Sequence, residues 1–184
     1  MKNKFITLSL FTLLFSFSSL SLANDVNAAI DKFKASPQLT KFFNNSYGYA
    51  IFPNIGKGGF GLGGAYGEGS VFKKGQKTGT SSMIQVTLGF QLGGQAFSEI
   101  IFFQNEKSYQ DFTSGNFEFS AQASAVAITA AANAKTSTTG IAAGAGEKSQ
   151  VGKYQNGMAA FTYIKGGLMY EAALGGQKFS FEKL

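Results

Sequence analysis

YGYAIFPNIGKGGFGLGGAYGEGSVF, residues 47–72, is the stretch of this 184-residue chain that decides the fold. Its glycines alternate with aromatic and aliphatic residues, a pattern that favours β-structure over a helix or a flexible linker. In the second half, Phe60, Leu62 and Tyr66 stand among glycines, so one face of the strand is bulky and the other is nearly bare backbone. Bare backbone permits close approach by a packed strand, a turn or a ligand. The stretch therefore predicts a glycine-rich strand with one face open to a close neighbour.

Other segments have the two-residue period of strands. Residues 83–92 alternate apolar with polar or glycine residues, which indicates a half-buried strand. Residues 117–134 also alternate, although their alanine content is that of a helix. We expect strands at 49–52, ended by Pro53-Asn54, at 58–71, at 83–92 with a continuation at 95–103, and at 117–134. We also expect a hairpin formed by 158–164 and 168–174 about Gly166-Gly167, and a last strand at Phe179 and Phe181. The connections expected between them are a basic loop at 73–79, a short helix begun by Asn105 and ended by Gly115, and a loop or plain edge hairpin at 134–153.

Two short amphipathic helices are expected before the first strand. From Asp25 to Lys34, apolar residues recur at i, i+3, i+4 and i+7, the spacing of one helix face. Ser36 followed by Pro37 then resembles an N-cap with proline at the first helical position, and this second helix should end near Asn45. The phenylalanines of these helices either pack on a sheet, leaving their lysines in water, or insert into a membrane.

These elements predict an α+β fold that is mainly antiparallel β. We expect a curled or closed, barrel-like, glycine-rich sheet, with the short N-terminal helices covering one end and one short internal helix.

Residues 1–23 have the pattern of a secretory signal peptide. A charged start precedes an apolar run from Phe5 to Leu22, and the small residues Ser21 and Ala23 stand before the expected cleavage site. The alternative is an uncleaved anchor helix. We expect cleavage after Ala23, leaving a single domain of residues 24–184 in the periplasm or the medium, with peripheral membrane association.

Composition excludes several classes of function. The chain has no cysteine and no histidine, which removes disulfides, thiol chemistry, the commonest general base and the usual transition-metal ligand. All 16 basic residues are lysine, and the absence of arginine argues against a nucleic-acid reader. After loss of the leader, 14 lysines would face 10 acidic residues, a mildly basic balance that suits an anionic lipid surface.

The motif matches that suggest enzymes lack their required context. Gly59, Gly61 and Gly64 satisfy GxGxxG, but no helix follows and no acid stands at the ribose-binding position. Ser70 to Lys73 is an SxxK and Lys77 to Gly79 a KTG, but these two β-lactamase signatures are separated by only three residues. The acids are scattered singly, and only folding could bring two together as a glycosidase pair. We therefore expect no enzyme, no cofactor and no metal site.

The blocks Tyr47-Gly48-Tyr49-Ala50-Ile51-Phe52-Pro53 and Gly58-Gly59-Phe60-Gly61-Leu62-Gly63-Gly64-Ala65-Tyr66-Gly67-Glu68-Gly69 resemble the SYLF family, also called the Ysc84 or YAB domain. Residues 91–96, 100–103 and 112–115 resemble its later segments in the same order. The resemblance spans roughly residues 28–181. It implies lipid binding, partly through an amphipathic N-terminal helix. In an exported bacterial member, anionic phospholipid or lipopolysaccharide is a more plausible target than phosphoinositides or actin.

The resemblance places candidate lipid-binding residues on the first helix, and charge beside aromatic residues adds others. The alternative is an envelope protein that binds a protein partner with the same face; an enzyme using Ser, Tyr, Lys or carboxylates ranks third. The candidates from the resemblance are Lys32, Phe33 and Lys34, and those from charge and aromatic proximity are Lys41, Phe42, Phe43, Lys57, Lys73, Lys74 and Lys77.

Overall fold

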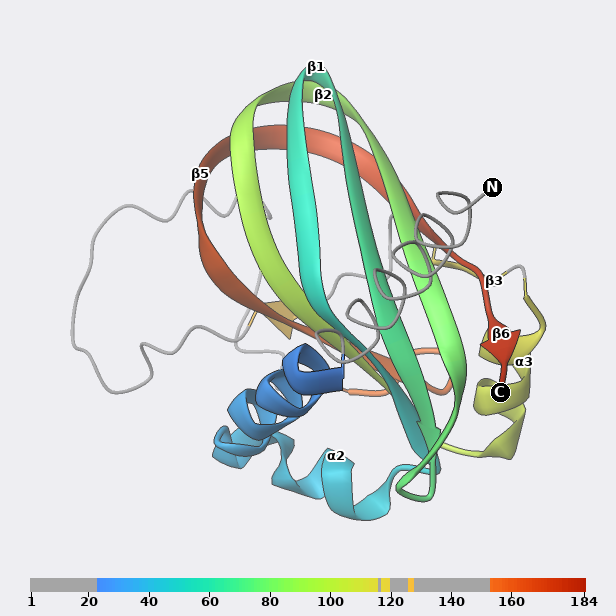
Figure 1. Cartoon of the computed structure of the whole chain (residues 1–184). Helices are drawn as coiled ribbons and strands as arrows, with labels where there is room; N and C mark the ends of the chain where they lie inside the picture. Colours follow the sequence, from blue (N-terminus) through green and yellow to red (C-terminus); the bar gives the residue numbers. More distant parts are fainter. Residues whose placement is uncertain (1–22, 116, 120–125, 128–152) are drawn as a thin grey trace, which may run out of the picture.

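The computed structural model describes residues 23–115, 117–119, 126–127 and 153–184. They form an α+β domain that is mainly antiparallel sheet (Figure 1). In chain order, the elements are a helix through residues 23–34, the 3₁₀ turn η1 (Pro37–Leu39), α2 (Thr40–Asn45), β1 (Gly48–Lys73), β2 (Gln76–Phe103), α3 (Glu106–Thr113), β3 (Phe117–Phe119), β4 (Val126–Ala127), β5 (Met158–Phe179) and β6 (Glu182–Lys183). The two expected N-terminal helices and the expected internal helix are confirmed. The proposed signal peptide lies outside the described residues.

Three very long strands make up most of the sheet. β1, β2 and β5 pair antiparallel in the order β1-β2-β5-β3, with β4 parallel to β5 and β6 antiparallel to β2. The expectation of a closed, barrel-like core is wrong. Within the described part of the chain, β1 pairs only with β2 and the three-residue β3 pairs only with β5, so the two ends of the pairing order do not join. Closure needs a continuous ladder between the end strands, and β3 is too short to supply it.

β1 continues through Pro53, where the sequence predicted its end. Proline cannot donate to a ladder, so it is tolerated at an edge or a bulge. Both conditions hold here, because β1 is an end strand and its pairing with β2 shifts register between Phe52 and Ile55. The Pro53 carbonyl accepts a hydrogen bond of 2.7 Å from Ser98 Oγ on β2.

The bare face of the glycine-rich stretch is covered by β1 itself. A Cβ on Gly67 would lie 2.6 Å from Ile55 Cγ1 and 2.9 Å from the carbonyl oxygen of Asn54. A Cβ on Gly59 would lie 2.6 Å from the Leu62 carbonyl, at the register shift between Phe60 and Leu62. The chain therefore bends near Gly59, and the two ends of β1 lie against one another. The close neighbour predicted from the glycines is thus the same strand.

The basic loop expected at 73–79 is reduced to a two-residue turn. Lys74 has φ 49° and Gly75 has φ 81°, and β2 begins at the next residue. Two consecutive residues with positive φ are typical of a type I′ hairpin turn. The lysines of this loop therefore sit on the turn and the strand ends beside it.

β5 is a single strand, so the hairpin expected about Gly166-Gly167 is wrong. The strand pairs with β2 from Met158 opposite Phe103 to Phe179 opposite Met83, with one register shift beside Gly166. The glycine pair is accommodated within the ladder because β2 supplies partners on both sides of it. Of the strand predicted at 117–134, the structure describes only β3 and β4, and the loop expected at 134–153 lies almost wholly outside the described residues.

Two aromatic-rich clusters of buried side chains hold the layers together. The first lies between the sheet and α3 and includes Phe52, Phe103, Phe112 and Phe179. The second packs the N-terminal helices on the sheet and includes Val26, Phe33, Leu39, Phe42, Ile100, Phe102 and Phe161. Among the described helices, none combines the length and apolarity needed to span a bilayer.

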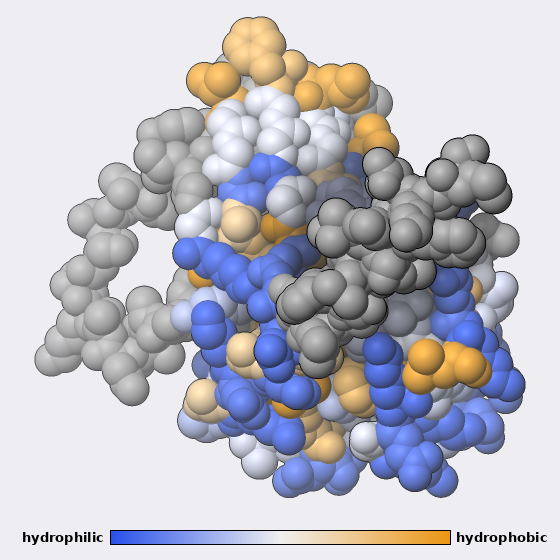
Figure 2. All heavy atoms as spheres, in the orientation of Figure 1, coloured by the Kyte–Doolittle hydropathy of each residue, from blue (hydrophilic) through white to orange (hydrophobic). Residues whose placement is uncertain are grey.

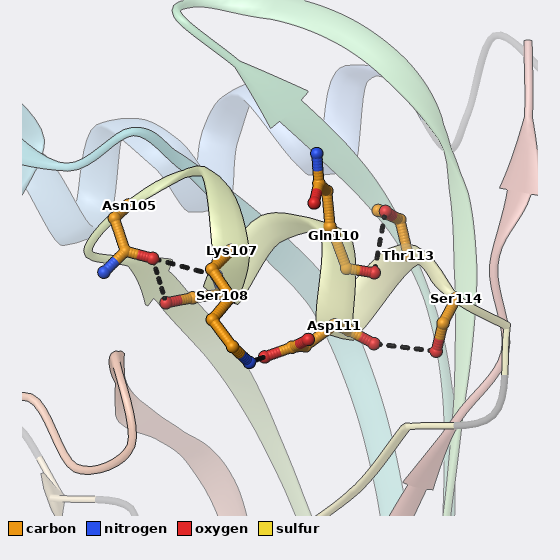
Figure 3. A network of polar contacts seen from close by, with 7 residues as sticks. All are labelled: Asn105, Lys107, Ser108, Gln110, Asp111, Thr113 and Ser114. Atoms are coloured by element: carbon orange, nitrogen blue, oxygen red, sulfur yellow. Dashed lines mark hydrogen bonds and ion pairs between the residues drawn. The ribbon is translucent and has the colours of Figure 1, made fainter.

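α3 begins as the sequence predicted. Asn105 Oδ1 accepts a hydrogen bond of 3.0 Å from the backbone N–H of Ser108, satisfying a donor that the helix leaves free (Figure 3). Lys107 and Asp111, one turn apart, form an ion pair of 2.7 Å. The helix ends at Thr113, and Gly115 follows with φ 95°.

Candidate functional site

The apolar sides of the N-terminal helices face the sheet. Phe33 is 1% exposed and Phe42 is 3% exposed, so both are core residues. Phe42 stacks with Phe102 at 5.4 Å between ring centroids and meets Phe161 edge-on at 4.9 Å. The expectation that Phe33 and Phe42 contact lipid therefore requires the helices to leave the sheet, because both rings are buried while the helices stay on it. Phe43 is half-buried.

Three candidate lysines on these helices are exposed, and each ammonium lies over an aromatic ring. The Nζ-to-centroid distances are 5.6 Å from Lys32 to Tyr163, 5.8 Å from Lys34 to Phe43, and 5.0 Å from Lys41 to its neighbour Phe42. Separations below about 6 Å give weak cation–π attraction that orients a lysine without neutralising it. Within the described residues, none of these three lysines forms an ion pair. We call Lys32, Lys34 and Lys41 the helix lysines.

Positive charge extends from the helix lysines onto β5. Burial and the nearby Lys32 ammonium lower the pKa of Lys165, with Asp25 acting in the opposite direction. Lys165 Nζ donates a hydrogen bond of 2.6 Å to Asn54 Oδ1, and Asn54 in turn donates to Asp25. The helix and β5 therefore bring two like charges close enough to repel.

The lysines of the β1–β2 turn make more contacts with aromatic rings and acids than the helix lysines do. Lys73 Nζ lies 5.1 Å from the Tyr47 ring and 3.7 Å from Glu106 Oε1, and Lys74 also lies over Tyr47 at 5.6 Å. Hydrogen bonding to Tyr47 is the largest cause raising the pKa of Lys73. Lys77 is exposed at the start of β2. α2 and this turn lie at the same end of the molecule (Figure 1).

Lys57 belongs to another part of the surface. It is half-buried on β1 opposite Gln95, three residues from the bend that carries Phe60. The structure thus separates the candidates into the helix lysines, the turn lysines and Lys57.

Large apolar side chains are exposed on the central parts of β1 and β2. Figure 2 shows apolar atoms gathered at this end of the molecule, away from α2 and the β1–β2 turn. Phe60 is 82% exposed and lies opposite Leu92, and Tyr66 lies opposite Ile84. We call this surface the apolar patch; its members are Phe60, Leu62, Tyr66, Ile84, Val86 and Leu92. Sequence reasoning identified a bulky strand face here but did not propose it as a site.

Glu99 is a buried acid that sequence reasoning passed over. It is 0% exposed, and burial raises its pKa from the ordinary 4.5 to about 7, partly offset by Gln177. Gln177 Nε2 donates a hydrogen bond of 3.0 Å to Oε2, whereas Oε1 has no hydrogen-bond partner among the residues that the structure describes. No set of three or more potential metal-ligating residues is found within the described residues.

Comparison with known proteins defines the class of this domain. Residues 84–183 match the family model Ysc84, described as "Las17-binding protein actin regulator". This match covers more than half of the chain, and the chain therefore belongs to the Ysc84 (SYLF) domain family. The matched region holds most of β2 and all of α3 and β5, whereas the tyrosine- and glycine-rich blocks at residues 47–69 precede it.

One curated relative is similar over most of the chain. It is "Beta cell expansion factor A" of Aeromonas veronii, 25% identical over 159 residues, which cover 85% of this chain. The match covers 54% of the relative, so the chain spans about half of that protein's length. No solved structure matches the chain significantly.

Proposed function

We propose that this protein is an exported, non-enzymatic lipid-binding domain that associates reversibly with anionic phospholipid or lipopolysaccharide surfaces. The observation that carries the proposal is the set of helix lysines: three exposed ammonium groups with no carboxylate partner in the described residues. Membership of the Ysc84 family is consistent with it.

The burial of Phe33 and Phe42 determines the kind of association. Because these rings are packed on the sheet, the helices would lie against the headgroups through their lysines instead of inserting their apolar faces. Each lysine contributes about 1 kcal/mol near an anionic leaflet, so the helix lysines together give about 3 kcal/mol. Lys74 and Lys77, at the same end of the domain, would add to this, whereas Lys73 is partly neutralised by Glu106. Such binding is weak and salt-sensitive.

Co-sedimentation of the purified protein with liposomes tests the proposal. The liposomes contain increasing fractions of phosphatidylglycerol, at low and at high salt. The test variant is Lys32→Gln with Lys34→Gln, and the matched control is Lys178→Gln with Lys183→Gln, which removes two charges from the C-terminal strands. We expect binding to rise with anionic lipid, to weaken with salt and to fall roughly 30-fold in the test variant.

Two results would contradict the proposal. One is an absence of binding at every lipid composition. The other is an equal loss of binding in the test and control variants, which would show that net charge matters and the helix lysines do not.

The second candidate function is a protein-binding envelope component, and the apolar patch favours it. Figure 2 shows apolar atoms gathered at one end of the molecule, and large exposed apolar patches mark interaction sites. Phe60→Ser with Leu62→Ser distinguishes the two functions. Loss of lipid-independent binding to an envelope protein, with liposome binding retained, would support the second; loss of liposome binding would instead place the lipid contact at the apolar patch.

A further inference from the structure

A surface cavity of about 410 Å³ lies where three distant segments meet. α2 supplies Lys41, Phe42 and Asn45, the connection between β2 and α3 supplies Gln104, and the chain before β5 supplies Lys153 and Tyr154. The rings of Phe42 and Tyr154 meet edge-on at 5.3 Å and form an apolar wall of the cavity.

The polar groups around the cavity favour an anion. Among the described residues that line it, none is acidic and two are lysines. Within the described residues, neither Lys41 nor Lys153 forms an ion pair. The side-chain amides of Asn45 and Gln104 add further hydrogen-bonding capacity, and Asn45 Nδ2 is already bonded to the Lys41 carbonyl at 2.8 Å.

Tyr154 provides a second, independent observation. Its hydroxyl is shielded from solvent and has no hydrogen-bond partner among the described residues, which is costly for a buried polar group. Burial raises the pKa of this hydroxyl, so it remains protonated and able to donate. A phosphate oxygen in the cavity would satisfy it once the Tyr154 side chain turns enough to bring its hydroxyl to the cavity surface.

We propose that this cavity binds a phosphate group, either as free phosphate or as a phosphomonoester or phosphodiester headgroup. Two ammonium groups neutralise the charge, and the phenol hydroxyl and the side-chain amides offer hydrogen bonds to the oxygens. The apolar wall formed by Phe42 and Tyr154 accommodates the carbon atoms attached to an esterified phosphate. The headgroup version rests on the proposed membrane function, whereas binding of free phosphate does not.

Titration of the purified protein with inorganic phosphate, and separately with phosphatidylglycerol vesicles, tests this site. Tyrosine fluorescence reports binding, since the chain contains seven tyrosines and no tryptophan. The variants are Lys153→Gln, which removes one cation, and Tyr154→Phe, which removes only the hydroxyl. Lys183→Gln on β6 is the matched control. Circular dichroism checks that each variant is folded.

We expect phosphate to bind and Lys153→Gln to weaken it about tenfold, as loss of one charged hydrogen bond predicts. Tyr154→Phe should weaken it severalfold and Lys183→Gln should leave it unchanged. No phosphate binding, or equal binding by wild type and Lys153→Gln, would overturn the site. Binding to phosphate without binding to vesicles would support a free-phosphate site and refute the membrane function. Vesicle binding that depends on Lys32 and Lys34 but not on Lys153, with no phosphate binding, would refute the site and leave the membrane function standing.

Discussion

Glu99 is the residue through which we expect pH to control the stability of this domain. The carboxyl is fully buried on β2, opposite Phe52 on β1 and Thr162 on β5. One oxygen accepts a hydrogen bond from Gln177, and the other has no hydrogen-bond partner in the described part of the chain. Glu99→Gln keeps the size of the side chain and an acceptor for Gln177, but it can no longer ionise.

The sign and size of the effect follow from the pKa of this carboxyl. Burial raises it from 4.5 to about 7 in the folded protein. Below pH 4.5 the group is protonated in both the folded and unfolded states, so its ionisation does not lower the free energy of unfolding. Between these values only the unfolded state ionises, so the free energy of unfolding falls as pH rises. Above pH 7 the loss levels off at about 3 kcal/mol, obtained from 1.36 kcal/mol per pH unit.

Urea unfolding monitored by circular dichroism, at a series of pH values from below 4.5 to above 7, measures this effect. The informative quantity is the stability of Glu99→Gln minus that of the wild type, because titrations common to both proteins cancel. We expect the difference to be small at the acid end and to reach about 3 kcal/mol in favour of the variant at the alkaline end. Glu182→Gln, at an exposed acid on β6, serves as the control and should show no such trend.

A difference that does not change with pH would refute the reasoning. It would mean that Glu99 ionises equally easily in the folded and unfolded states. A difference of the opposite sign would mean that the folded protein stabilises the carboxylate.

Three further substitutions test the packing on which the candidate surfaces depend. Phe42→Ala should lower the free energy of unfolding by about 3 to 5 kcal/mol, because the ring is buried among aromatic neighbours. Phe43→Ala should lower it less, because the Phe43 ring is only half-buried. Chemical denaturation compares the two variants, and equal losses of stability would contradict the assignment of Phe42 to the core. Gly67→Ala should lower the melting temperature, because its Cβ would lie 2.6 Å from the Ile55 side chain on the other half of β1. Gly56→Ala, with open space around it, should not, and similar melting temperatures of the two variants would show that the two halves of β1 are not in close contact. Asn105→Ala should cost about 1 kcal/mol through loss of the α3 cap, and unchanged thermal stability would show that the cap is dispensable.

Local elements were predictable wherever the signal is periodic or chemical. The helix through residues 23–34 buries Val26, Ala29, Ile30 and Phe33, the four residues that its spacing indicated. The N-cap at Asn105 and the helix end before Gly115 were also correct, because capping depends on the residue and its immediate neighbours.

The errors arose where a neighbouring strand overrode a local signal. Pro53 and Gly166-Gly167 are breakers in isolation, but each lies at or beside a register shift in an antiparallel ladder more than 20 residues long. Closure of the sheet was also misjudged, since it depends on whether the end strands meet, and no local pattern reports that.

The candidate site shows the same division. The sequence alone established the lysine-only basic charge, the lack of cysteine and histidine, the amphipathic helices and the family resemblance, because these depend on residue identity and short-range order. Only the tertiary structure decided that Phe33 and Phe42 are buried while the helix lysines stay exposed, that β1 covers its own glycines, and that Glu99 is enclosed. It alone brought Lys41 and Lys153 to one cavity, because contacts between residues more than 100 positions apart depend on how the strands pair and the helices pack.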